Sequence, residues 1–132
     1  MKDNSTETKE KKTDSENFKL KDLSERIITA FYNVYNTLGY GFLEKVYENA
    51  MIIELERMGL PVKAQWPLNV FYSGKIVGEY FADLLVGESI IVEIKAAKNL
   101  SSENEAQLLN YLKATQIEVG LLLNFGPKPE VR

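Results

Sequence analysis

The sequence predicts an α+β domain of the α/β/α kind, with a mixed central β-sheet of four to five strands flanked by helices. Two segments with helical periodicity come first, between residues 22 and 58. Apolar runs separated by Gly-containing turns occupy the middle of the chain, which is the pattern of β-hairpins. A third helical segment then lies between two strands, and such a helix is a natural right-handed crossover between parallel strands.

Two helices are expected in the first half of the domain. The first covers about residues 22–38 and ends at Gly39, with apolar residues at helical spacing at Leu23, Ile27, Phe31, Val34 and Leu38. The second covers about residues 42–58, with an apolar stripe that includes Val46, Ala50, Ile53 and Leu55. Glu44 falls in the first turn of this helix, where the helix dipole alone favours an acid.

A strand-rich region follows the second helix. Val62–Tyr72 alternates in polarity, and Pro67 indicates an edge strand or an irregular one. Residues 76–86 form the next strand, and a short turn then leads into Ile90–Lys95. After a third helix over about residues 102–115, Val119–Phe125 is apolar on both faces, so we expect it to be a central strand that is covered on each side.

The chain is expected to fold as a single domain over residues 21–127. Residues 1–20 are predicted to be a disordered charged tail, because positions 2–17 contain no apolar residue to bury. The charged end, residues 128–132, is predicted to be frayed.

Composition restricts the chemistry that the chain can perform. Its 132 residues suffice for one domain, and a hydrophobic content of 45% can supply a buried core. The chain has no cysteine and no histidine, which excludes disulfides, thiolate metal sites and catalysis by imidazole. Any metal must therefore bind oxygen ligands, which favours Mg²⁺ or Mn²⁺ over Zn²⁺.

Charge and hydropathy give two further expectations. No segment is long and apolar enough to cross a membrane and no signal peptide is visible, so we expect a cytoplasmic protein without a membrane partner. The formal net charge of −3 argues against a strong general nucleic-acid binder, which usually carries a basic stripe. It leaves open an enzyme that meets phosphate groups through a bound cation.

Asp83, Glu93 and Lys95 are the strongest candidates for a functional site. If Val86 pairs with Ile90 across the turn, Asp83 lies directly opposite Glu93. Side chains alternate along a strand, so Glu93 and Lys95 point the same way as Asp83. Two acids on neighbouring strands can hold a divalent cation, and an adjacent Lys can orient a water or a phosphate oxygen. This is the minimal set of groups for metal-assisted phosphodiester hydrolysis.

A simpler interpretation is that these charges belong to the solvated face of an antiparallel sheet. Two observations weigh against it. Asp83 opposite Glu93 places like charges side by side, which destabilises a sheet unless a cation offsets the repulsion. Strict alternation also places Phe81, Leu85 and Ile91 on the same face, among which unpaired charges are costly.

The third helix carries a second group of candidates. Gln107 and Tyr111 are four residues apart and share a face, with Asn104 one turn earlier. The opposite stripe, Leu108, Leu109 and Leu112, is predicted to be the core-facing side. If this helix packs beside the strand that ends at Lys95, Gln107 can reach the carboxylates or a nucleic-acid backbone; otherwise the pattern is an ordinary polar helix face.

Taken in order, these motifs resemble a known family. Asp83, then Glu93-Ile94-Lys95, then Gln107-Leu108-Leu109-Asn110-Tyr111 resembles the metal-dependent nuclease core called PD-(D/E)XK, including the Gln-x-x-x-Tyr helix of its RecB-like members. The upstream run Gly41-Phe42-Leu43-Glu44-Lys45-Val46-Tyr47 is similar to the pattern of the GxxExxY proteins, a branch of that superfamily. The resemblance covers about residues 22–126 and implies a restriction-endonuclease-like core.

The resemblance implies a role for each matching residue. Asp83 and Glu93 would ligate Mg²⁺ or Mn²⁺ together with the backbone carbonyl of Ile94, and Glu44 would extend the acidic site. Lys95 would orient and help to deprotonate the attacking water. Gln107 would fix Lys95 or the substrate. Tyr111 would support Gln107, and Tyr47 completes the upstream motif as a further supporting residue.

The function that the resemblance implies is hydrolysis of nucleic acid, DNA in preference to RNA, by an enzyme that can act as a homodimer. An alternative is a catalytically inactive module that keeps the fold for binding or regulation. The acidic balance and the small size favour this alternative, as do Tyr35 and Asn104, which stand where members of the branch commonly carry His. A third possibility is a structural domain whose charges are only surface, and that one predicts no metal binding.

Overall fold

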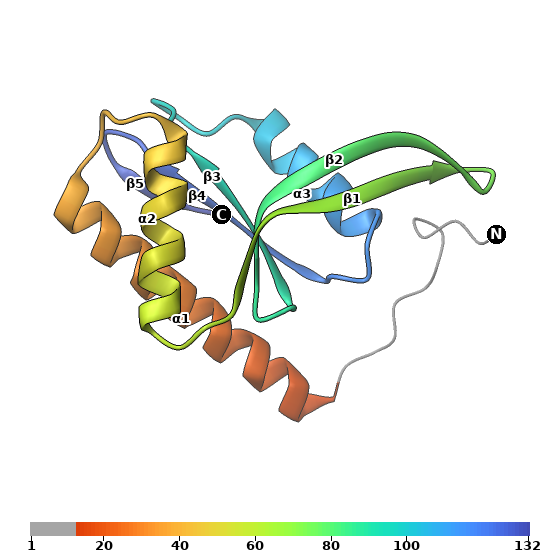
Figure 1. The fold of residues 1–132 in the computed structure, drawn as a ribbon, viewed down its shortest axis with the longest axis horizontal. Coiled ribbons are helices and arrows are strands. Elements are labelled where there is room, and N and C mark those ends of the chain that lie inside the picture. The colour runs from red at the N-terminus through yellow and green to blue at the C-terminus, as the bar shows by residue number, and fades with distance from the viewer. Residues whose placement is uncertain (1–12) are drawn as a thin grey trace.

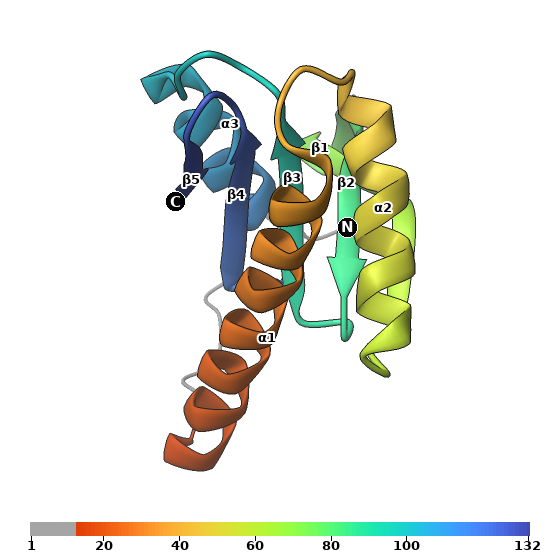
Figure 2. The same cartoon turned by 90° about the vertical axis from the view of Figure 1, so that its left-hand side faces the viewer.

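The computed structural model describes residues 13–132 and shows three layers, with a sheet between helices (Figures 1 and 2). The elements in chain order are α1 (Asp14–Leu38), α2 (Glu44–Arg57), β1 (Val62–Tyr72), β2 (Lys75–Val86), β3 (Ile90–Lys95), α3 (Ser102–Lys113), β4 (Val119–Phe125) and β5 (Pro129–Val131). Helices α1 and α2 cover one face of the sheet and α3 covers the other (Figure 2). The predicted α+β architecture is confirmed.

The sheet is mixed, with the strand order β1-β2-β3-β4-β5. β1, β2 and β3 form an antiparallel meander, β3 and β4 are parallel, and β4 and β5 are antiparallel. The helix between the two parallel strands is α3, as a crossover requires. β1 is an edge strand, as Pro67 indicated, and β4 lies inside the sheet with its last five residues buried.

Two apolar clusters lie on the two faces of the sheet. The larger packs α1 and α2, through residues such as Phe31 and Met51, against Leu84, Val92 and Leu123. The smaller packs Leu108 and Tyr111 of α3 against Leu85, Ile91 and Leu122. Neighbouring residues of β3 and β4 therefore alternate between the clusters, which is the expected pattern for strands covered on both sides.

The structure differs from the expected disorder at both ends of the chain that it describes. α1 begins at Asp14 within the predicted tail, because a capping box between Thr13 and Glu16 satisfies the first free N–H groups. The C-terminus is not frayed, because β5 pairs with β4 and the backbone of Arg132 exchanges hydrogen bonds with Leu122. The predicted disorder of residues 1–12 lies outside the described residues.

The predicted inner faces of α2 and α3 also need correction. α2 buries Tyr47, Glu48, Met51 and Leu55, whereas Val46 and Ile53 of the predicted stripe are exposed. On α3, Leu109 is exposed and Tyr111 is buried beside Leu108. Leu55 and Leu108 of the predicted stripes are buried as expected, but Tyr47 and Tyr111 also face the core, so the apolar pattern alone predicted only part of each inner face. No helix among residues 13–132 is long and apolar enough to span a membrane.

Candidate metal centre

Asp83 and Glu93, named here the carboxylate pair, lie where β2 and β3 separate. Val86 pairs with Ile90 as predicted, and the ladder continues to Leu84 and Val92. Just beyond these pairs on each strand, a side-chain carboxylate of the opposite strand takes the place of the backbone carbonyl as hydrogen-bond acceptor. The Asp83 N–H donates to Glu93 Oε2 at 2.6 Å, and the Ile94 N–H donates to Asp83 Oδ2 at 2.7 Å. These reciprocal bonds hold two acids together at the fork between two strands.

β2 is irregular at Asp83. The ladder with β1 runs through Ala64–Leu84 and Trp66–Ala82 but omits the intervening position, where Gln65 has a left-handed φ of 52°. Ala82 and Leu85 both contact the α3 cluster although they are three apart. The strict alternation used above therefore fails here, and Phe81, expected to surround the acids, is 57% exposed. Leu85 and Ile91 are buried as expected.

Lys95 ends β3, paired with Asn124 of β4. Its side chain is half-buried. Its positive charge opposes the rise that burial causes in the pKa of both Asp83 and Glu93. Within residues 13–132 its ammonium group makes no hydrogen bond or ion pair. Lys95 is therefore near the pair and available to a third group.

Helix α2 brings further acids to the pair. Glu44 is its first residue, and it lines a pocket of about 230 Å³ together with Glu48, Asp83 and Ile94. The charge of Glu44 raises the pKa of Asp83 and of Glu93, which places it within electrostatic range of both. The structure thus brings Glu44 and Ile94 beside Asp83. Ligation of a cation by the Glu44 carboxylate or the Ile94 carbonyl remains a prediction.

Glu48 is a residue that the sequence analysis missed. It is buried, accepts a hydrogen bond from Gln65 Nε2 at 2.6 Å, and forms an ion pair of 2.5 Å with Lys45. Its charge also raises the pKa of Asp83. Its spacing of four residues from Glu44 was the available signal, because that spacing places both on one helix face. Gln65 had no such signal, since its left-handed backbone is unusual for a residue other than Gly.

Tyr47 holds the corner that precedes Glu44. Its side chain is fully buried and stacks on Phe125, with ring centroids 4.3 Å apart. Its hydroxyl donates to the Gly39 carbonyl at 2.7 Å and accepts from the Phe42 N–H at 3.2 Å. Gly41 has a φ of 114°, which only Gly adopts readily. The Gly-x-x-Glu-x-x-Tyr spacing therefore has a structural reason: it fixes the start of α2.

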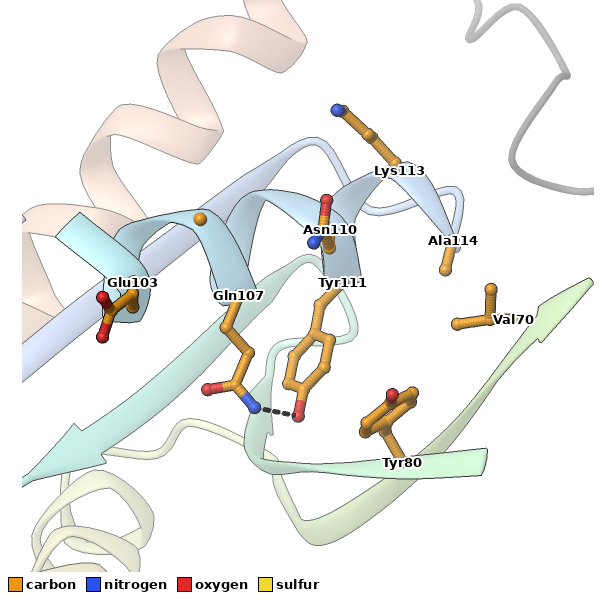
Figure 3. Close-up of a pocket in the computed structure, with 9 residues that line it drawn as sticks. Val70, Tyr80, Glu103, Gln107, Asn110, Tyr111, Lys113 and Ala114 are labelled. Atoms are coloured by element: carbon orange, nitrogen blue, oxygen red, sulfur yellow. Dashed lines mark hydrogen bonds between the residues drawn. The ribbon is translucent and has the colours of Figure 1, made fainter. Parts of the chain in front are cut away.

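Gln107 and Tyr111 point from α3 toward β2 (Figure 3). Gln107 Nε2 donates to the Tyr111 hydroxyl at 3.0 Å; a supporting role of Tyr111 for Gln107 remains a prediction. No hydrogen bond joins Gln107 to Lys95 in the described part of the chain, so of the two expected roles of Gln107 the contact with Lys95 is not formed in this structure. Burial, followed by the charge of Glu93, raises the pKa of the Tyr111 hydroxyl, which places Tyr111 near the pair.

The two positions of the missing imidazoles have structural roles. The Tyr35 hydroxyl contacts the carbonyls of Gly126 and Pro127, at 2.7 and 3.0 Å. The Asn104 side chain accepts from the Ser101 N–H and completes a capping box at the start of α3. Each residue stabilises an element beside the site.

The pair has unusual electrostatics. Burial, followed by the charge of Asp83, raises the pKa of Glu93 to about 7, against the opposing effect of the Asp83 N–H. Burial likewise raises the pKa of Asp83, although the Ile94 N–H opposes that shift. Two adjacent carboxylates with reduced access to water resist being charged together. A bound cation would favour the doubly charged state.

This shift predicts that the metal-free protein loses stability as the pH rises. Folded Glu93, with a pKa of about 7 against an ordinary value of 4.5, binds its proton more tightly than in the unfolded chain. The free energy of unfolding should therefore fall between about pH 5 and pH 8, by roughly 2 kcal/mol. Denaturant titrations in EDTA, followed by Trp66 fluorescence, measure it. Glu93→Gln keeps an acceptor for the Asp83 N–H and should flatten the dependence; an equally steep fall in this variant would contradict the prediction.

The donor set fits a cation that prefers oxygen. Asp83 and Glu93 each use one oxygen for a backbone N–H, and the other has no protein partner among the described residues. No three acidic side chains within residues 13–132 form a ready metal cluster. Mg²⁺ commonly binds through one or two carboxylates and keeps several waters, so the pair is a sufficient protein contribution.

One of three comparisons with known proteins gives a match. The family model of the PD-(D/E)XK nuclease superfamily matches residues 21–132. Neither a curated protein nor a solved structure gives a significant match. The match spans the sheet, all the candidate residues and most of α1. The chain belongs to the PD-(D/E)XK nuclease superfamily.

Proposed function

We propose that the protein is a Mg²⁺- or Mn²⁺-dependent nuclease that hydrolyses phosphodiester bonds, in DNA in preference to RNA. The observation that carries this proposal is the interlocked carboxylate pair beside Lys95, in a chain of the PD-(D/E)XK nuclease superfamily. Each carboxylate of the pair keeps one oxygen without a partner among residues 13–132, both carboxyl groups have a raised pKa, and an ammonium group lies beside them; together these suit a cation and a phosphate.

The residues divide the chemistry among them. Asp83 and Glu93 would hold the cation, with the Ile94 carbonyl and Glu44 as further donors on the pocket side. When bound, such a cation polarises a phosphoryl oxygen and makes a nearby water more acidic. Lys95 orients that water and stabilises the charge that develops on the phosphate oxygens. Gln107, held by Tyr111, positions the substrate strand.

Three finer assignments are part of this proposal. The chain would be a member of the GxxExxY branch; the spacing of Gly41, Glu44 and Tyr47 supports this assignment, and the Tyr47 hydrogen bonds give that spacing a structural reason. The protein would act in the cytoplasm. A homodimer is the expected assembly, which light scattering coupled to gel filtration tests.

Metal-dependent cleavage is the direct test. Purified protein is incubated with single-stranded and duplex DNA and with RNA, in Mn²⁺, in Mg²⁺ and in EDTA. We expect cleavage only with the metals, and a loss of about a hundredfold or more in Asp83→Asn, because metal polarisation contributes several kcal/mol. Asp22→Asn, an exposed acid of α1, is the matched control. Cleavage that persists in EDTA, or at full rate in Asp83→Asn, would overturn the proposal.

The inactive-module alternative gives a different pattern. The absence of a three-acid cluster in the described region and the net charge of −3 are the observations that favour it. It predicts that calorimetry detects Mn²⁺ binding, and that Asp83→Asn abolishes that binding, while no nucleic acid is cut. Binding that is accompanied by cleavage selects the nuclease.

A further inference from the structure

A second cavity lies between α3 and the β1–β2 hairpin. It encloses about 560 Å³, more than twice the volume of the pocket beside Asp83. Tyr111 and Gln107 line it from α3, and Tyr80 and Val70 face them from the two strands (Figure 3). The roles proposed above use Gln107 and Tyr111 only, and they leave this cavity without a function.

The lining suits a flat, uncharged group. The rings of Tyr80 and Tyr111 are 5.7 Å apart at an angle of 47°, so they form an open aromatic notch. Tyr80 is 45% exposed and has a ring face available for stacking. The only charged lining residues, Glu103 and Lys113, have opposite signs, which gives the cavity no net attraction for a phosphate.

A directional polar group completes the lining. Gln107 uses one N–H for the Tyr111 hydroxyl, and its carbonyl oxygen and second N–H have no partner within the described residues. An amide with a free donor and a free acceptor matches the edge of a nucleobase, which presents the same two kinds of group.

The cavity shares no lining residue with the pocket beside Asp83, but Tyr111 brings it close to the carboxylate pair. The charges of Glu93 and Asp83 both contribute to the raised pKa of the Tyr111 hydroxyl, so Tyr111 lies within electrostatic range of the pair. Tyr80 precedes Asp83 by three residues on β2. A strand whose phosphate lies at the carboxylate pair would therefore carry a neighbouring base past the notch.

We propose that this cavity, the base pocket, binds one unpaired nucleobase of the strand whose phosphate lies at the carboxylate pair. The base stacks on Tyr80, and the free amide groups of Gln107 bind its edge. This inference rests on the proposed function and adds the class of substrate. In a duplex the bases are stacked and paired, so the substrate is a single strand, or a duplex with a frayed or extruded nucleotide.

Binding measurements test the pocket without turnover. Fluorescence anisotropy of labelled DNA is measured with Ca²⁺, which takes the same oxygen ligands as Mg²⁺, for a single strand and a duplex of equal length. Tyr80→Ala should weaken single-strand binding about 5- to 100-fold, which is the range for one stacked base. Tyr80→Phe, which keeps the ring, should bind within about twofold of the wild type. Tyr72→Ala, an exposed Tyr at the end of β1 outside the pocket, is the matched control and should have no effect.

Abasic strands identify the stacked base. A scan of single abasic positions should show one position where the wild type loses about as much affinity as Tyr80→Ala does, and where Tyr80→Ala loses nothing more. Equal affinity of Tyr80→Ala and wild type for the single strand would overturn the base pocket. So would additive losses at every abasic position, or duplex binding as tight as single-strand binding.

The two proposals can fail separately. Cleavage in Mn²⁺ with no effect of Tyr80→Ala or of abasic positions would retain the nuclease and reject the base pocket. Ring-dependent binding of a single strand without cleavage would retain the pocket and reject the nuclease. A protein that binds neither strand form would reject both.

Discussion

Replacing Lys95 by Ala is expected to slow metal-dependent cleavage by about 10²- to 10⁴-fold, the range for losing one positioned acid–base group. The Lys95 ammonium lies beside the carboxylate pair, makes no ion pair within residues 13–132, and is placed to stabilise negative charge on the phosphate without being a metal ligand. Its removal should leave Mn²⁺ affinity almost intact at high pH. At lower pH that affinity should fall, because Lys95 lowers the pKa of both carboxylates.

The Lys95 test needs two companion variants. Lys98→Ala removes an exposed positive charge three residues further on and should retain full activity. Lys95→Arg keeps the positive charge but places it on a planar guanidinium group at a different distance from the backbone, so we expect only partial activity. Initial rates at saturating metal and calorimetric Mn²⁺ affinity are measured for each. Undiminished cleavage by Lys95→Ala would refute the assigned mechanism even if the fold and the metal site are correct.

The strand register could be predicted because local chemistry fixes it. Gly87 has a φ of 59°, and this turn sets Val86 opposite Ile90. One residue of slippage would have moved every apolar side chain of β3 to the other face. Counting residues back from the Val86–Ile90 pair along both strands places Asp83 opposite Glu93. The exchange of their backbone and carboxylate hydrogen bonds does not follow from such counting, because it requires the strands to separate at that point.

The features that sequence reasoning missed depend on contacts between distant segments. Glu48 is buried because Gln65, seventeen residues later, contacts it from an irregular position in β1. β5 has only three residues and begins with Pro129, so its pairing with β4 has no local pattern. Tyr111 looked like part of a polar face, yet it is buried beside Leu108 where α3 meets the sheet. In each case tertiary context outweighed the local pattern.

The loop after Lys95 is anchored by a buried Asn, which explains how a half-buried Lys can be held at a strand end. The Asn124 side chain accepts from the Ala97 N–H and donates to the Ala97 carbonyl, each at 2.9 Å. Asn124 is fully buried and pairs with Lys95 across the parallel strands. The position of Lys95 is therefore coupled to the end of β4.

Gly126→Ala should disrupt this anchor and cause the largest loss of stability of the substitutions considered. A Cβ at Gly126 would lie 2.3 Å from the Ala97 carbonyl oxygen and 2.9 Å from Asn124 Nδ2. Because the nearest atom belongs to the backbone, the loop itself must move. Overpacking of this kind costs about 1–3 kcal/mol, and each weakened hydrogen bond adds about 1 kcal/mol. We expect the free energy of unfolding to fall by about 3 kcal/mol.

Urea titrations followed by Trp66 fluorescence measure this loss, and Gly59→Ala is the comparator. A Cβ at Gly59 meets no atom within 4 Å, but the φ of 82° strains any other residue, so this variant isolates the backbone cost of about 1 kcal/mol. Amide exchange at Ala97 should be faster in Gly126→Ala and unchanged in Gly59→Ala. Cleavage should also fall in Gly126→Ala under conditions where it stays folded, because the displaced loop begins directly after Lys95. If the free energy of unfolding fell equally in the two variants and amide exchange at Ala97 were unaltered, the loop would have moved aside without cost. That outcome would show that Asn124 does not position Lys95.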